Sequence, residues 1–105
     1  MPDVRRLATR NASLTYTLSG DAGSSAAPVV LIHGWGCQRG DWTAVASELS
    51  VRRRVVALDL PGFGESCARR TRYTVRAFAD DVSAVIDAEG LGGAAVVTAY
   101  QRAER

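Results

Sequence analysis

The apolar residues of this chain fall into short runs that predict β-strands. Val29–Ile32 and Val55–Leu58 are four-residue apolar runs without polar alternation, a pattern typical of strands that are covered on both faces of a sheet. A third strand of this kind is predicted over residues 94–98. Residues 4–8 and 13–18 are predicted as a leading pair of strands, because the second of them alternates apolar residues with threonines.

A first helix is predicted between the runs Val29–Ile32 and Val55–Leu58. Asp41 is expected to cap it, because a carboxylate accepts hydrogen bonds from the free N–H groups of a first helical turn. Apolar residues at positions i, i+3, i+4 and i+7 would form the stripe that faces the sheet. They are Trp42, Val45, Ala46 and Leu49.

A second helix is predicted from its cap, Thr74, to the glycines that begin at Gly90. Its apolar stripe consists of Val75, Phe78, Ala79, Val82, Val85 and Ile86. Its opposite face is expected to be polar and consists of Arg76, Asp80, Asp81 and Asp87. Residues 60–72, which contain Pro61 and two glycines, are predicted to form a long loop. The alternation of strands and helices predicts an α/β fold with right-handed βαβ units and mainly parallel strands.

Composition limits the classes of function. The chain has 105 residues, 47% apolar and 23% charged, which is typical of one soluble domain or part of one. All 13 basic residues are arginine, and their clusters lack interleaved aromatic residues, so a solvated surface is favoured over nucleic-acid binding. The residues at the N-terminus do not resemble a secretory signal, and no apolar run would span a bilayer. We therefore expect a cytoplasmic protein without nucleic-acid or membrane partners.

Cys37 and Cys67 are the only cysteines, and their spacing predicts neither a zinc site nor a disulfide framework. No metal and no cofactor are expected. Each cysteine follows the carboxyl end of a predicted strand, so we expect the two thiols to lie near one another and to stay reduced in the cytoplasm.

The sequence His33-Gly34-Trp35-Gly36 directly follows the first apolar run. Two glycines around one large residue allow a sharp turn, and a turn at the carboxyl end of a sheet strand can direct backbone N–H groups at a ligand. A turn that only links strand to helix explains these residues equally well.

Three features together resemble the amino-terminal part of the α/β-hydrolase fold family. The first is the strand that leads into the His33–Gly36 turn, with Trp42 at the start of a helix. The second is the run DLPGFGES, residues 59–66, after the next strand. The third is the helix from Thr74 that precedes a further strand. The resemblance implies a partial α/β-hydrolase sheet, a leading strand pair followed by βαβαβ, in which residues 1–105 form an incomplete domain.

The resemblance implies roles for individual residues. Serine hydrolases of this family cleave carboxylic esters, and backbone N–H groups stabilise the oxyanion. One donor would be the N–H of Trp35, held in a loop formed with His33, Gly34 and Gly36. His33 would bond the loop backbone rather than act as a base. The DLPGFGES run would shape the pocket wall, with support from Asp59, Gly62, Gly64 and Ser66.

The sequence departs from the family pattern where the nucleophile elbow G-x-S-x-G is expected. The corresponding residues 99–103 lack both glycines, and Gln101 stands at the serine position. His33 is the only histidine, so the triad is incomplete. We therefore expect an inactive, truncated or frame-shifted fragment that would act on a small ester only if completed. Residues 94–98 would then leave an open sheet edge, which favours self-association.

Two alternatives remain at this point. A dinucleotide-binding unit would use Gly34 and Gly36 for the pyrophosphate and Asp59 for the ribose, although Trp35 would crowd the pyrophosphate. The second alternative is a non-catalytic remnant that binds a partner. Neither substrate nor acyl length follows from the sequence.

Overall fold

The computed structural model describes residues 3–10, 12–21, 23–33, 39–60, 67–68 and 74–98. The elements, in chain order, are β1 (Asp3–Ala8), β2 (Ala12–Ser19), β3 (Val29–Ile32), the 3-10 helix η1 (Arg39–Trp42), α1 (Thr43–Leu49), β4 (Val55–Leu58), β5 (Cys67–Ala68), α2 (Val75–Glu89) and β6 (Ala95–Thr98). Within these ranges, no helix is long and apolar enough to cross a bilayer.

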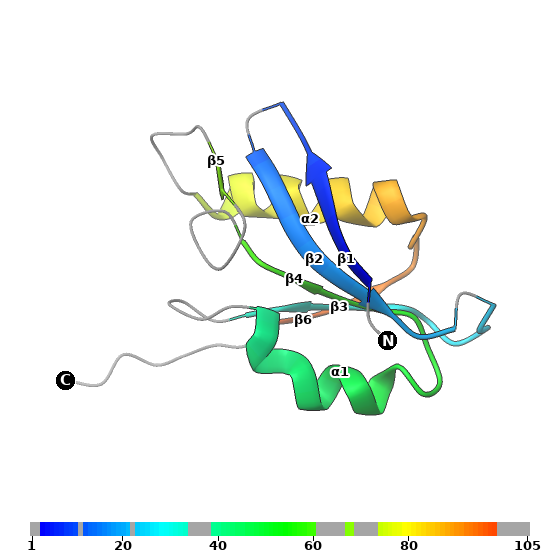
Figure 1. The fold of residues 1–105 in the computed structure, drawn as a ribbon. Coiled ribbons are helices and arrows are strands. Elements are labelled where there is room, and N and C mark those ends of the chain that lie inside the picture. The colour runs from blue at the N-terminus through cyan, green and yellow to red at the C-terminus, as the bar shows by residue number, and fades with distance from the viewer. Residues whose placement is uncertain are drawn as a thin grey trace.

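The strands form one sheet with the order β1-β2-β4-β3-β6, and β5 pairs with β2 beside this path. The β1–β2 and β2–β4 pairs are antiparallel, whereas β4–β3 and β3–β6 are parallel. Helices α1 and α2 lie on opposite sides of the sheet (Figure 1). The predicted α/β class, with a leading strand pair followed by parallel strands, is confirmed.

The two apolar runs are buried on both faces because each face has its own helix. Alternate residues Val29 and Leu31 of β3 face a cluster on the α1 side, against which Trp42, Ala46 and Leu49 pack. The other residues of β3, Val30 and Ile32, join the larger cluster on the α2 side. Strand β4 divides its side chains in the same way, which explains why neither run alternates with polar residues.

The start of the first helix differs from the prediction. Trp42, not Asp41, occupies the N-cap of α1, and no side chain caps this helix. Asp41 lies inside η1, whose 3-10 turn precedes α1. Val45 was assigned to the apolar stripe but is exposed, because α1 has only seven residues and contacts the sheet through Ala46 and Leu49.

The second helix matches its predicted boundaries. The Thr74 hydroxyl accepts a hydrogen bond from Ala77 N at 3.0 Å, which confirms the predicted cap. At the other end Gly90 has φ of +66°, and Leu91 N donates to Ile86 O at 2.9 Å, the arrangement that glycine favours after a helix. Asp81 was predicted to lie on the exposed polar face of this helix, but it is buried.

The segment 60–72 was predicted to be a loop throughout, but residues 67–68 form β5. This short strand pairs antiparallel with β2, with Ser13 opposite Cys67. A two-residue strand has no periodicity of its own, so pairing with β2 defines it.

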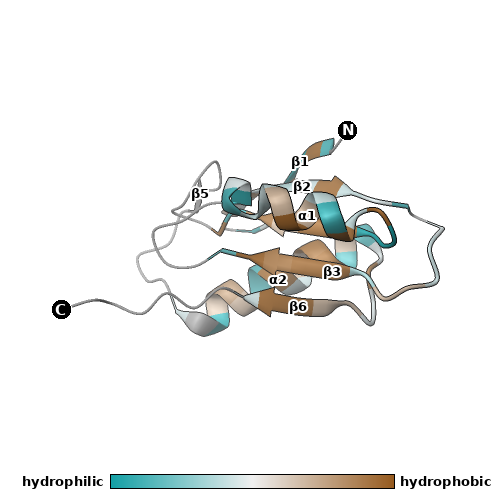
Figure 2. Ribbon diagram, turned by 90° about the horizontal axis from the view of Figure 1, so that it is seen from below, coloured by the Kyte–Doolittle hydropathy of each residue, from teal (hydrophilic) through white to brown (hydrophobic). Residues whose placement is uncertain are grey.

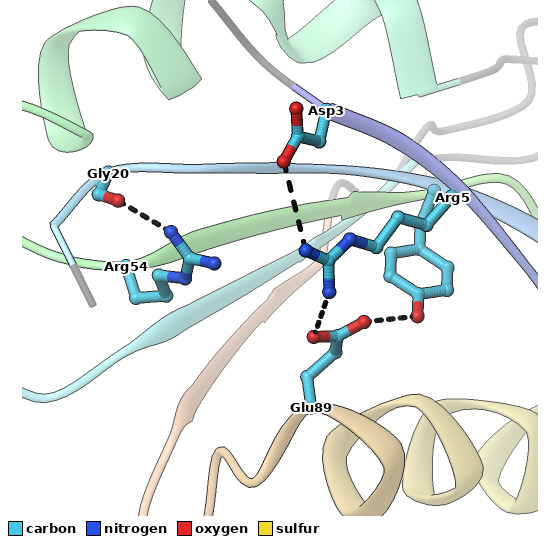
Figure 3. A network of polar contacts seen from close by, with 6 residues as sticks. Asp3, Arg5, Gly20, Arg54 and Glu89 are labelled. Carbon is cyan, nitrogen blue, oxygen red and sulfur yellow. Dashed lines mark hydrogen bonds and ion pairs between the residues drawn. The ribbon is translucent and has the colours of Figure 1, made fainter.

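A partly buried polar network ties α2 to the β1–β2 hairpin. Glu89, the last residue of α2, accepts hydrogen bonds from Arg5 Nη1 at 2.8 Å and from the Tyr16 hydroxyl at 2.5 Å. Figure 3 shows the Glu89 carboxylate facing Arg5. Burial, together with the hydrogen bond to Glu89, raises the pKa of Tyr16 to about 12. A carboxylate is unfavourable at a helix C-terminus, and Arg5 offsets that charge.

Gly20 marks a close approach of two backbone segments. It has φ of +90°, and a Cβ at this position would lie 1.9 Å from Arg53 O. Arg54 Nη1 donates to Gly20 O at 2.6 Å, as Figure 3 shows. The chain that leaves β2 therefore packs directly against the chain that enters β4, and only glycine fits there.

We predict that Gly20→Ala destabilises the fold by about 2–5 kcal/mol, because a left-handed φ and a backbone clash add together. Gly90→Ala is the matched control: its φ is also positive, but no atom lies within 4 Å of the added Cβ, so we expect roughly 1–2 kcal/mol. Urea denaturation followed by circular dichroism measures both. Equal losses for the two variants would show that the approach to Arg53 does not constrain the fold.

We predict that stability falls between pH of about 10 and 12, because Tyr16 releases its proton less readily when folded. The raised pKa corresponds to about 2–3 kcal/mol, present below pH 10 and lost as the pH rises through 12. Tyr16→Phe is the control, because it lacks the titrating hydroxyl while every other group is the same in the two proteins. The stability difference between the two proteins should close across this range, and a constant difference would contradict the prediction.

Candidate active site

Two of the predicted site residues, His33 and Asp59, lie where two parallel strands end. His33 directly follows β3, and Asp59 directly follows β4. In the parallel register Ile32 pairs with Leu58, so His33 and Asp59 leave neighbouring strands at the same edge of the sheet. This is the edge at which open α/β sheets bind their ligands.

His33 is buried and bonds the backbone of the next loop. Its Nε2 accepts a hydrogen bond from Leu60 N at 3.0 Å. Because Nε2 accepts, the proton of the neutral ring lies on Nδ1. The interpretation of His33 as a residue that bonds loop backbone agrees with this contact, whereas its place in an oxyanion-hole loop remains a prediction.

Asp59 has no exposed surface and is held from two sides. Its Oδ1 accepts a hydrogen bond from the backbone N of Arg39 at 2.6 Å, and its Oδ2 forms an ion pair with the Arg39 guanidinium. Its own N–H donates to Thr15 O, a residue of β2, at 3.0 Å. The carboxylate therefore joins the end of β4 to the first residue of η1.

These contacts fix both ends of the segment that carries the glycine turn. Residues 34–38 lie outside the described part of the chain, but the residues on either side of them are described. His33 is bonded to Leu60, and Arg39 is bonded to Asp59. Two consecutive residues at the end of β4 thus hold the start and the end of one short segment.

Trp42 packs against the core at the start of α1. Its ring packs against the cluster of Val29, Leu31, Val55 and Ala57 on the α1 side of the sheet. Its buried indole N–H has no hydrogen-bond partner among the described residues. The tryptophan therefore contributes apolar contact at the start of α1, one residue before the helix begins.

Several predicted residues lie outside the described part of the chain. They are Gly34, Trp35, Gly36, Cys37, Gly62, Gly64, Ser66 and residues 99–103 with Gln101. Their roles, and the proximity of Cys37 to Cys67, remain predictions. The strands that precede the two cysteines are parallel neighbours, as that prediction requires.

The environment of Asp59 does not favour the dinucleotide alternative. A ribose-binding carboxylate must be free to accept hydrogen bonds from a ligand. Asp59 is instead fully buried and bonded to Arg39. Sequence reasoning missed Arg39, because a partner twenty residues away leaves no periodic signal.

Comparison with known proteins identifies the family to which this chain is similar. Residues 27–98, which include both helices, the parallel strands and His33, Arg39 and Asp59, match the model for the alpha/beta hydrolase fold. The chain belongs to the α/β-hydrolase fold family. The resemblance drawn from the sequence is confirmed.

Two curated proteins are similar to this α/β-hydrolase chain over more than half of its length. A dihydrolipoyllysine-residue acetyltransferase component of the acetoin cleaving system from Pseudomonas putida is 38% identical over 72 residues, 69% of this chain and 19% of that protein. A pimeloyl-acyl-carrier-protein methyl ester esterase from Aeromonas hydrophila is 39% identical over 59 residues, 55% of this chain and 23% of that protein. The chain thus spans about a fifth of these two relatives.

Solved α/β-hydrolase structures superpose closely. A candidate epoxide hydrolase from Pseudomonas aeruginosa has a TM-score of 0.83 at 30% identity, covering 92% of this chain and 32% of that one. A haloalkane dehalogenase from Bradyrhizobium elkani has the same TM-score at 22% identity, covering 93% and 33%. The similarity to the dehalogenase shows a shared fold and nothing further.

We predict that Arg39→Ala destabilises the chain more than Asp59→Asn does. The first change leaves a carboxylate fully buried without its cation, which costs roughly 3–5 kcal/mol. The second leaves a guanidinium whose side chain is 14% exposed and can reach water. The double variant should lose less than the sum of the two, by urea denaturation.

Asp80→Asn, an exposed aspartate of α2, is the control and should change stability by less than about 0.5 kcal/mol. Strictly additive losses for Arg39 and Asp59 would show that the two side chains do not act as a pair.

Proposed function

We propose that this chain supplies the oxyanion side of an α/β-hydrolase site that cleaves carboxylic esters. The backbone N–H of Trp35 is the proposed donor, in a loop formed with His33, Gly34 and Gly36. Asp59 supports this loop from the end of β4, and Gly62, Gly64 and Ser66 contribute to the pocket wall. The esterase among the relatives supports the choice of ester chemistry.

The observation that carries the proposal is the attachment of both ends of the glycine turn. His33 is bonded to Leu60 N, and Arg39 is bonded to Asp59. An oxyanion donor stabilises a transition state only if its position is set before the reaction, so that no energy is spent on reorganisation. The contacts of His33 and Arg39 on either side of residues 34–38 support the proposal that this segment is held in place.

The chemistry follows from the charge that ester cleavage creates. When a serine hydroxyl attacks the ester carbonyl, the carbonyl oxygen gains negative charge. The N–H of Trp35 would donate a hydrogen bond to this oxygen, worth roughly 3 kcal/mol in the transition state. Only the backbone N–H takes part, so the indole side chain is left to line the acyl pocket.

We further propose that these 105 residues alone do not hydrolyse esters. The only histidine is His33, and its Nε2 already accepts the Leu60 N–H. It therefore offers no ring nitrogen at that position to take a proton from a nucleophile. Gln101 also stands where the resemblance places the serine, and an amide is not an activated nucleophile.

A fusion protein tests the proposal. Residues 1–98 would be joined to the carboxyl-terminal part of the Aeromonas hydrophila esterase, which would provide the nucleophile and the base. We expect the fusion to cleave a short-chain nitrophenyl ester, and the unfused 105 residues to give no turnover above background. A folded fusion without turnover would contradict the proposed function.

Two changes at Trp35 in the fusion separate its backbone from its side chain. Trp35→Pro removes the N–H and should lower kcat by about 10²–10³-fold. Trp35→Ala keeps the N–H and should alter mainly the preference among acyl lengths. Because proline restricts the backbone, circular dichroism must show that both variants fold. A folded proline variant with unchanged kcat would exclude Trp35 as the donor.

A further inference from the structure

A polar pocket lies at the amino ends of the parallel strands, whereas His33 and Asp59 lie at their carboxyl ends. Its volume is about 450 Å³, and it is lined by residues 21, 24–28, 54 and 89–93. Arg54 directly precedes β4 and Pro28 directly precedes β3, so the pocket belongs to the middle of the sheet. Figure 2 shows that the apolar colouring of β3 and β6 gives way to paler colouring in the connections at their amino ends. A pocket of this size accommodates a small molecule.

Arg54 supplies this pocket with a cation that no carboxylate of the described residues neutralises. Its Nη1 donates to the backbone O of Gly20 at 2.6 Å (Figure 3), and it takes part in none of the ion pairs of the described chain. The guanidinium is planar and has five N–H donors, of which a carboxylate can accept two side by side. Arg54 therefore offers a binding position for a carboxylate group.

Asp21 and the end of α2 bring negative charge to the same pocket. The Asp21 Oδ1 accepts a hydrogen bond from the Gly23 N–H at 2.8 Å, and no cation of the described residues pairs with it. The C-terminal end of α2 carries the partial negative charge of the helix dipole. The Glu89 carboxylate is occupied by Arg5 and Tyr16. These charges favour an ammonium group in the pocket and disfavour a dianion such as phosphate.

We propose that this pocket binds a small zwitterion, a molecule that carries one carboxylate and one ammonium group. The carboxylate would pair with Arg54, and the ammonium group would lie at Asp21 and the C-terminal end of α2. The turn between α2 and β6 leaves room for it, because no atom lies within 4 Å of a Cβ added at Gly90, Gly92 or Gly93. The inference does not depend on the proposed ester chemistry, which takes place at the opposite ends of the strands.

Titration of the 105-residue chain followed by amide chemical shifts tests the proposal. The probes are L-alanine, γ-aminobutyrate and glycylglycine, whose two charged groups lie progressively farther apart. We expect at least one of them to bind more tightly than acetate, methylammonium and inorganic phosphate. Failure of all three to bind would overturn the proposal. Equally tight binding of acetate or phosphate would overturn it too, because it would indicate a simple anion site.

The same titration locates the site. The amides of Gly92 and Gly93 line the pocket and should shift, whereas those of Arg39 and Leu60, at the carboxyl ends of the strands, should not. Shifts at Arg39 and Leu60 without shifts at the two glycines would place the ligand elsewhere and refute the assignment. This comparison uses the unaltered chain, so it stands even if a variant fails to fold.

Matched variants identify the groups that bind. Arg54→Gln keeps a donor for Gly20 O but removes the cation, and should weaken binding about 10–100-fold, the effect of one hydrogen bond to a charged group. Asp21→Asn keeps an acceptor for the Gly23 N–H and should weaken binding less, because Asp21 is exposed. Arg52→Gln is the control, since Arg52 is exposed and does not line the pocket, and it should leave affinity unchanged. Equal losses for Arg54→Gln and Arg52→Gln, with both variants folded by circular dichroism, would refute the role of Arg54.

Discussion

The buried carboxylate of Asp59 is the constraint on which the proposed site depends. It has no contact with water, so its charge must be matched inside the protein, and Arg39 provides both a backbone N–H and a guanidinium. A buried charge left without such partners is strongly destabilising. The fold therefore cannot form well unless residue 39 returns to the end of β4. This requirement fixes the far end of the glycine turn.

The near end of the turn is fixed by a neutral contact. His33 accepts the N–H of Leu60, the residue that follows Asp59. Strands β3 and β4 are buried on both faces and paired in parallel, so the positions of His33 and Asp59 follow from the buried centre of the sheet. The sheet, the ion pair and the histidine contact together connect core packing to the placement of a loop.

The elements of the core could be predicted from the sequence because two-sided burial leaves a visible pattern. Val29–Ile32 and Val55–Leu58 read as covered strands, and Thr74 and Gly90 marked the ends of α2. The start of α1 could not be predicted, because the 3-10 turn η1 placed Asp41 within a turn and Trp42 at the cap. Residues 67–68 form a strand only through their pairing with β2.

The candidate site was predictable only where it lies next to a strand. His33 and Asp59 were found because they directly follow apolar runs, whereas Arg39 acts through Asp59, which lies twenty residues away. Tyr16, which lies outside the site, likewise bonds the distant Glu89. Such contacts depend on topology, and no local pattern encodes them. The same holds for Asp81, whose helical position predicted exposure although the fold buries it.

Residues 59 and 60 contact the residues on either side of the segment 34–38. Amide hydrogen exchange of Arg39 and Leu60, followed by nuclear magnetic resonance, measures this attachment, because these two N–H groups make the contacts. We expect both amides to exchange as slowly as that of Val56 in the centre of β4. We also expect Asp59→Asn to accelerate exchange at Arg39 while leaving Val56 unchanged. Rapid exchange of Arg39 and Leu60 in the unaltered chain would show that residues 59 and 60 do not hold this segment.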